Sequence, residues 1–150
     1  MSVRIIDSFT GKYDFLSNFY IARVHLWGVD FPSNEHAFVW CKNSKQFKAE
    51  WLDLSPGKVK QKGRKVTLHS NWDEVKYDRM YDICLEKFRQ QSWLRYRLLR
   101  TNNAELIEGN YWHDTDWGVC MGNCRNSPHI PVGQNNLGIT LMRVREELRK

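Results

Sequence analysis

The chain has 150 residues, a formal net charge of +6 and four cysteines, which suits one folded domain and gives too few cysteines for a disulfide framework. Its first ten residues lack the apolar core of a signal peptide, and no stretch approaches the length of a membrane span. We therefore expect a single domain over residues 1–150, in the cytoplasm, with reduced thiols and no membrane partner. The positive charge favours phosphates, nucleotides or nucleic acid as partners.

The first thirty residues are predicted to be mainly extended. Residues 3–9 and 21–26 read as strands, and the second strand turns at Trp27-Gly28 into residues 29–31. The loop between the strands, residues 15–20, mixes aromatic and small polar side chains. That mixture suits a ligand as well as a turn.

Start signals predict three helices in the next segment. Ser33 can cap a helix that runs to about Asn43, and Ser55-Pro56 opens a second helix. Gly63 closes or bends that second helix. Asn71 starts the third helix, and Glu74 three residues later completes a capping box. The third helix should bury one stripe of side chains at steps of three and one, namely Tyr77, Met80, Tyr81, Cys84, Leu85 and Phe88.

The last third of the chain contains two more predicted helices around an irregular region. One helix begins at Ser92 and ends near Arg100, and the other places Leu137, Leu141, Val144 and Leu148 on one face. Residues 110–136 show no period, and irregular stretches of this length are usually functional or disordered. The predicted fold class is α+β, a predominantly helical single domain with a small antiparallel β-sheet near the N-terminus.

Glu35 and Lys42 stand at the two ends of the first predicted helix. Their seven-residue spacing, at about 100° per residue, places them within roughly 20° of each other around the helix axis. It also separates them by about 10 Å along the axis, so they should line one cavity without a simple ion pair. The same positions complement the helix dipole, which requires no chemistry.

Other polar residues carry weaker indications. His36 could orient a carboxylate or donate a proton, although a lone histidine is more often a surface or core residue. Cys120 and Cys124, with His113 and His129 nearby, lack the usual tetrahedral spacing of a zinc site, so no metal is expected. Asp114, Asp116 and Trp117-Gly118 form an acidic and aromatic cluster that could build a turn or supply a second carboxylate.

Six fragments, taken in order, resemble the NADAR (YbiA-like) family. They are Ser17-Asn18-Phe19, Ser33-Asn34-Glu35-His36 with Lys42, Gly63-Arg64, Trp72-Asp73-Glu74-Val75-Lys76 with Met80, Asp114-x-x-Trp117-Gly118, and Gly133-x-Asn135-x-Leu137-Gly138. Each fragment alone is short. Their order and spacing extend the resemblance over about residues 9 to 149.

The resemblance implies an N-glycosidase that breaks a bond between ribose C1′ and nitrogen, with no cofactor. One family activity is the removal of ADP-ribose from modified guanine, and we expect this activity here, on nucleotides or DNA. Another is the hydrolysis of phosphoribosylamino-pyrimidine intermediates of riboflavin synthesis. By position, the catalytic residues would be Glu35, Lys42 and Asp114. The substrate-binding residues would be Ser17, Asn18, Phe19, His36, Arg64, Trp117, Gly118 and Asn135.

Two mechanisms fit these residue types. Glu35 or Asp114 could stabilise the positive charge that develops on the sugar. Lys42, with its pKa lowered by burial, could attack C1′ and form a Schiff base with the opened sugar. Instead, a carboxylate could activate water while Lys42 anchors a phosphate or the leaving group. The sequence leaves both mechanisms open.

The sequence departs from the family pattern at two places. Val39 and Trp40 stand where the family usually has Gln and Ala. Residues 119–132 form a longer connection than usual, either a specificity lid or a surface insertion. The basic stretches and tryptophans also suit a protein of another class, a non-catalytic module that binds nucleotides, ADP-ribose or nucleic acid.

Overall fold

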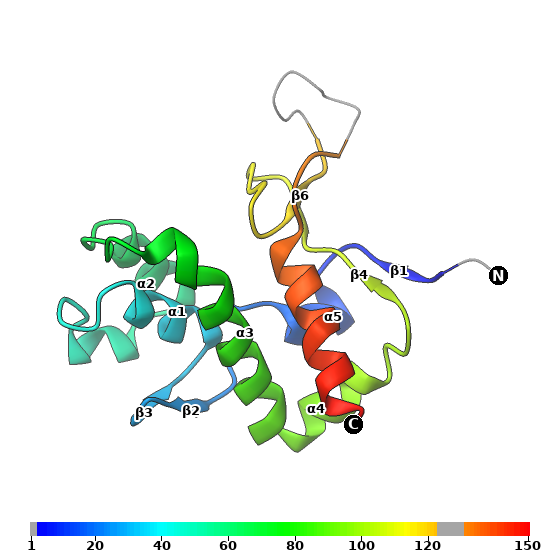
Figure 1. Cartoon of the computed structure of the whole chain (residues 1–150), viewed down its shortest axis with the longest axis horizontal. Helices are drawn as coiled ribbons and strands as arrows, with labels where there is room; N and C mark the ends of the chain where they lie inside the picture. The colour runs from blue at the N-terminus through cyan, green and yellow to red at the C-terminus, as the bar shows by residue number, and fades with distance from the viewer. Residues whose placement is uncertain (1–2, 123–130) are drawn as a thin grey trace. The chain divides into compact units, whose positions relative to one another are not determined.

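The computed structural model of the chain describes residues 3–122 and 131–150. They belong to two units, Asn18–Trp93, called here the central unit, and Met1–Ser17 with Leu94–Lys150, called here the terminal unit. Helices and small two-stranded sheets make up both units (Figure 1), which confirms the mixed α and β class. The prediction that residues 1–150 are one domain stays a prediction. No helix in the described ranges is long and apolar enough to span a membrane.

The central unit begins with a β-hairpin. Strands β2 (Val24–Leu26) and β3 (Val29–Phe31) pair in antiparallel register, as the sequence predicts for this region. The two turn residues both have positive φ, 54° at Trp27 and 79° at Gly28. Such a pair defines the type I′ turn that matches the twist of a hairpin, although a tryptophan rarely adopts that conformation.

Helices α1 (Asn34–Lys42) and α2 (Pro56–Gly63) follow, separated by a short 3-10 helix, η2 (Ala49–Asp53). The predicted Ser33 cap and the predicted helix start at Ser55-Pro56 are confirmed, and the Ser33 and Ser55 hydroxyls each accept a backbone N–H three residues later. Gly63 allows α2 to pack closely on α1. A Cβ there would stand 2.7 Å from Cγ2 of Val39.

Helix α3 (Trp72–Gln90) completes the central unit and packs along α1. Its buried positions include Met80, Ile83, Cys84 and Phe88, which confirms Cys84 as a core residue. The predicted capping box is wrong, because the Asn71 side chain makes no capping hydrogen bond. The Asn71 backbone, at φ −101° and ψ 17°, lies outside the extended region that an N-cap residue normally adopts.

Short strands and two helices form the terminal unit. Strand β1 (Ile5–Ile6) pairs in parallel with β4 (Glu105–Leu106), and β5 (Gly109–Asn110) pairs in parallel with β6 (Val119–Cys120). The remaining elements are the 3-10 helix η1 (Gly11–Leu16), helix α4 (Ser92–Leu99), which starts at the end of the central unit, and helix α5 (Asn136–Leu148). The strand expected over residues 3–9 is therefore much shorter. Its partner strand is one hundred residues away in the sequence, which a local pattern does not reveal.

The start of α5 is held against β4 by close backbone contact. Asn135 adopts a left-handed conformation with φ 57°, and its amide nitrogen donates to the Leu106 carbonyl at 2.9 Å. Its amide oxygen accepts from the Glu108 N–H at 3.0 Å. A Cβ at Gly138 would stand 2.1 Å from the Leu106 oxygen, so glycine is required there.

Replacing Gly138 with alanine should therefore lower the free energy of unfolding by about 1–3 kcal/mol, the usual penalty for forcing an extra methyl group into a packed site. Gly57→Ala is the matched control, because Gly57 also lies in a helix and nothing stands within 4 Å of its Cβ position. Urea unfolding of both variants measures the difference. Equal stability of the two variants would contradict the packing at Gly138.

Candidate active site

Glu35 occupies the first turn of α1 in the central unit. Only 7% of its surface is exposed, and its backbone N–H donates to the Asn18 carbonyl at 3.1 Å. The Asn18 side-chain oxygen accepts from the Asn34 amide at 3.3 Å. These two contacts fix the loop that carries Asn18 against the start of α1.

Asn34 leaves one polar atom unsatisfied beside Glu35. Its side-chain oxygen is buried and accepts no hydrogen bond within the described part of the chain. A buried acceptor without a donor is unfavourable by about 1–3 kcal/mol, and such atoms recur at sites of function. The start of α1 therefore has an acceptor available to water or to a ligand.

Lys42 is the last residue of α1, and its side chain is half-buried. Its ammonium nitrogen lies 5.6 Å from the centroid of the Phe38 ring. Among the residues that the structure describes, Lys42 forms no ion pair, although it lies in the electrostatic field of Glu35. No carboxylate of the described residues therefore neutralises this amine by direct contact.

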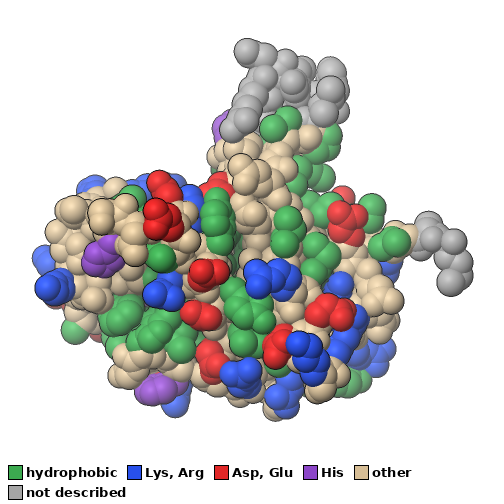
Figure 2. Space-filling view, in the orientation of Figure 1, with side chains coloured by type: hydrophobic (Ala, Val, Ile, Leu, Met, Phe, Trp, Pro, Cys, Tyr) green, Lys and Arg blue, Asp and Glu red, His purple; other side chains and the backbone are tan. Residues whose placement is uncertain are grey.

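Three more cations surround Lys42. Burial lowers the pKa of Lys42, the Glu35 carboxylate opposes that shift, and the charges of Lys60, Arg64 and Lys76 reinforce it. Arg64 is among the predicted substrate-binding residues, whereas Lys60 and Lys76 are not. On the face drawn in Figure 2, basic side chains are interspersed with acidic ones. Lys76 also forms an ion pair with Asp73 at 3.3 Å, so four cations and two carboxylates are involved and the local charge stays positive.

Phe19 adds an aromatic surface to this cluster. Its side chain is 42% exposed, and the Lys60 ammonium lies 5.5 Å from its ring centroid. Trp72 packs beneath the cluster with its ring 5.2 Å from the ring of Phe38. An exposed ring beside several cations can stack on a base or sugar while the cations bind phosphate.

His36 has a different setting from the one predicted. It is fully buried, with Nδ1 2.7 Å from the Ser33 hydroxyl and Nε2 2.8 Å from the Leu54 carbonyl. Nε2–H therefore donates to Leu54, and Nδ1 accepts from Ser33. Burial lowers the pKa of His36, which favours this neutral form. Both ring nitrogens are occupied, so the geometry favours a structural role over contact with substrate.

Asp114 lies in the terminal unit, where its side chain builds a loop. Its Oδ1 accepts from the backbone N–H groups of Asp116 at 3.1 Å and Trp117 at 2.9 Å. Asn110 binds the backbone of Asp114 through both its amide oxygen and its amide nitrogen. One carboxylate oxygen of Asp114 is thus committed to structure.

The remaining predicted contacts divide between scaffold and surface. Gly118 is buried, and a Cβ there would stand 2.4 Å from the Glu108 carbonyl. Asn135 uses both side-chain atoms on backbone groups. Ser17 ends η1, with its N–H bound to the Asp14 carbonyl. Arg64, at the end of α2, is exposed.

The cysteines show a mixed outcome. Cys41 and Cys84 are thiols outside any disulfide, whereas Cys120 is disulfide-bonded, so the expectation of four reduced thiols is wrong for Cys120. Cys124, His129 and most of the 119–132 connection lie outside the described residues. Within residues 3–122 and 131–150, no group of three or more His, Cys, Asp or Glu side chains is placed to hold a metal.

A buried carboxylate and a partly buried amine lie here among further cations, and such a net positive charge favours an anionic ligand. The NADAR domain matches residues 7–149 of the sequence, so the chain belongs to the NADAR domain family. The chain is similar to a solved NMR structure of the Escherichia coli protein YbiA, with a TM-score of 0.78 and 30% identity. The match covers 99% of this chain and 87% of that one.

Relatives with names extend the comparison. The N-glycosidase Npun_R5314 of Nostoc punctiforme is 33% identical over 91% of this chain and 86% of its own length. The N-glycosidase YbiA of Escherichia coli is 30% identical, over 99% and 91% of the two chains. The riboflavin biosynthesis protein VVA0006 of Vibrio vulnificus is 31% identical over 93% of this chain and 36% of its own length.

The charges around Lys42 predict opposite responses to two substitutions. Glu35→Gln removes the negative charge that raises the pKa of Lys42, so that pKa should fall further. Arg64→Met removes a positive charge that lowers it, so the pKa should rise. Titration of the ¹³Cε resonance of labelled Lys42 measures both shifts, with Lys58 as an exposed internal reference. Shifts of the same sign would contradict the proposed cluster.

Proposed function

We propose that this protein is an N-glycosidase that hydrolyses the bond between ribose C1′ and a nitrogen. The observation that carries the proposal is the buried Glu35 and the half-buried Lys42 on α1, surrounded by Lys60, Arg64 and Lys76. A ribosyl phosphate offers both groups that such a site can use, an anionic phosphate and an electrophilic carbon. Relatives named as N-glycosidases support the same reaction class.

Glu35 is the carboxylate that we assign to charge stabilisation. Cleavage of an N-glycoside moves the electron pair of the C1′–N bond onto the leaving base, and positive charge develops on the sugar. A carboxylate that is 7% exposed acts on that charge through little water, so the stabilisation is strong. The base then takes a proton, and the oxygen of water ends on C1′.

Lys42 is the nucleophile that we assign to the first step. Burial and three neighbouring cations lower its pKa, which increases the fraction of neutral amine. Its nitrogen attacks C1′ as the base leaves, the sugar ring opens to an imine, and water hydrolyses the imine to release the sugar and free Lys42. In the direct-water mechanism, Lys42 stays protonated and holds a phosphate.

Asp114 remains a proposed second carboxylate, with Oδ2 as its available atom, and Trp117 follows it in the same loop. Phe19 and Arg64 are our candidates for substrate contact, because both are exposed beside Lys42 or its neighbouring cations. Asn18 is a positioning residue through its hydrogen bond to the backbone of Glu35.

ADP-ribosylated guanine, in nucleotides or DNA, is the substrate that we propose. Its diphosphate can bind to cations on two helices, Lys60 on α2 and Lys76 on α3. A phosphoribosylamino-pyrimidine of riboflavin synthesis is the second candidate. The similarity to a Vibrio protein named for riboflavin biosynthesis supports it.

Lys42→Ala and Glu35→Ala should each lower turnover by roughly 10²–10⁴-fold, the contribution usual for one positioned catalytic group. The assays follow free ADP-ribose from ADP-ribosylated guanosine in DNA, and ribose 5-phosphate from the aminopyrimidine ribotide. Lys62→Ala is the matched control, because Lys62 is an exposed lysine of α2 and is not among the charges that act on Lys42. Wild-type turnover in both active-site variants, with folding verified by circular dichroism, would refute the assignment.

Reduction with borohydride during turnover distinguishes the two mechanisms. If Lys42 forms an imine, reduction should link the sugar covalently to Lys42 and inactivate the enzyme, and peptide mass spectrometry should locate the adduct. The Lys42→Arg variant should show no adduct, because its guanidinium stays protonated. An active enzyme that yields no adduct under borohydride would assign the reaction to direct attack by water.

A further inference from the structure

A concave site lies in the central unit, and its lining does not include Lys42 or the charges that act on it. It is a groove of about 380 Å³ between the β2–β3 hairpin, α1 and the start of α3. The side chains that line it include Trp27, Trp40, Ser44, His69, Asn71 and Arg79. Its volume is in the range of small-molecule sites, which is roughly 300–1,000 Å³.

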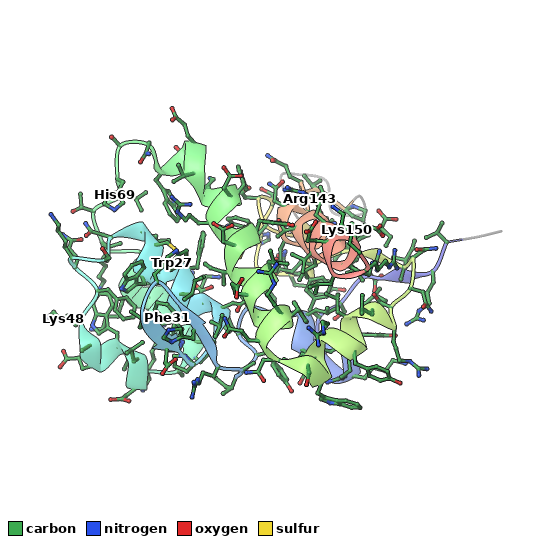
Figure 3. All side chains as sticks on the ribbon, turned by 60° about the horizontal axis from the view of Figure 1, so that its bottom comes forward. Trp27, Phe31, Lys48, His69, Arg143 and Lys150 are labelled. Carbon is green, nitrogen blue, oxygen red and sulfur yellow. The ribbon has the colours of Figure 1, made fainter. Side chains whose placement is uncertain are left out.

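Stacked aromatic rings form one wall of the groove. The rings of Trp27 and Trp40 are 5.4 Å apart and nearly parallel, at 9°, and Phe31 packs edge-on against Trp40 at 6.0 Å. Trp27 and Phe31 belong to the hairpin, and His69 lies on the loop before α3 (Figure 3). Trp27 remains 38% exposed at the end of this stack.

Trp27 holds an unfavourable backbone conformation at this position. Its φ of 54° is one that glycine or asparagine adopts readily and a bulky residue rarely does. Non-glycine residues in this region are strained and gather at ligand sites. An exposed indole kept there despite the strain points to a use for its ring.

The opposite part of the groove is polar and positive. Arg79 is half-exposed, and its ion pair to Asp82 is long, at 3.6 Å, so its guanidinium can take a second anion. His69 is exposed. Asn71 also lines the groove, and its side chain makes no capping hydrogen bond to α3. Flat apolar rings, hydrogen-bonding groups and a cation match a planar base that carries a phosphate.

The groove uses a different side of α1 from the candidate active site. Trp40 precedes Lys42 by two residues, which turns it roughly 160° away around the helix axis. The groove can therefore be filled or altered without occupying the surface where Lys42 meets Phe38.

We propose that this groove binds a nucleotide, with its base stacked on Trp27 and its phosphate held by Arg79 and His69. The nucleotide can be free or part of a single strand, because both present the same base and phosphate. Stacking of a base on an aromatic side chain contributes about 1–3 kcal/mol, which corresponds to a roughly 5- to 150-fold change in affinity.

The test uses the full chain with AMP, GMP, CMP and UMP, and with a short single-stranded oligonucleotide. Binding should shift the indole N–H resonance of Trp27. That resonance is assigned as the one that disappears from the spectrum of the Trp27→Asn variant. Trp27→Asn should weaken binding by roughly 5- to 150-fold and keep the fold, because Asn-Gly is a preferred type I′ turn pair. Trp27→Phe should restore most of the affinity.

Two controls separate the groove from other contacts. Trp93→Ala removes a tryptophan that is 66% exposed and not in the groove, and should leave affinity unchanged. Arg79→Ala should weaken the binding of AMP and leave the binding of adenosine, which has no phosphate, unchanged. Tighter, salt-dependent binding of the oligonucleotide identifies a single strand as the ligand, and equal affinity identifies a free nucleotide. No shift of the Trp27 resonance with any probe, or wild-type affinity in Trp27→Asn, would overturn the proposal.

Discussion

The burial of the first half of α1 is the constraint on which the candidate active site depends. Residues 34–39 are all buried, although this turn of helix reads Asn-Glu-His and brings polar groups with it. The Ser33 hydroxyl, the Leu54 carbonyl and the Asn18 loop supply hydrogen bonds to this turn. Glu35 lies in this turn, its backbone N–H donates to the Asn18 carbonyl, and its carboxylate has little water around it. Its charge then acts more strongly on nearby groups than an exposed carboxylate would.

Much of the fold could be predicted because its signals are local. Ser33 and Ser55 mark two helix starts, and the spacing of Met80, Cys84 and Phe88 marks the buried face of α3. Non-local features escaped prediction. The pairing of β1 with β4 depends on residues far apart in sequence, and the Asn71 cap fails because a turn in the preceding loop sets its backbone.

The same distinction applies to the candidate site. Glu35 and Lys42 share one helix, so their common face follows from the helical repeat. The sequence does not show that Lys60 and Lys76 act on Lys42, since they come from α2 and α3. A place in a family motif also does not distinguish a residue that contacts substrate from one that stabilises the fold. Asn135 belongs to a motif fragment, yet the structure uses both ends of its amide on backbone groups.

The close packing of α1 and α2 connects these observations. Val39 fills the space left open by the missing side chain of Gly63. That contact brings α2 against α1, so Lys60 and Arg64 act on Lys42 from a neighbouring helix. On the other side of α1, the ring of Trp40 stacks on the ring of Trp27. A single rigid helix thus carries an electrostatic site on one side and an aromatic groove on the other. Substitutions on one side can change one ligand while the other site keeps its geometry.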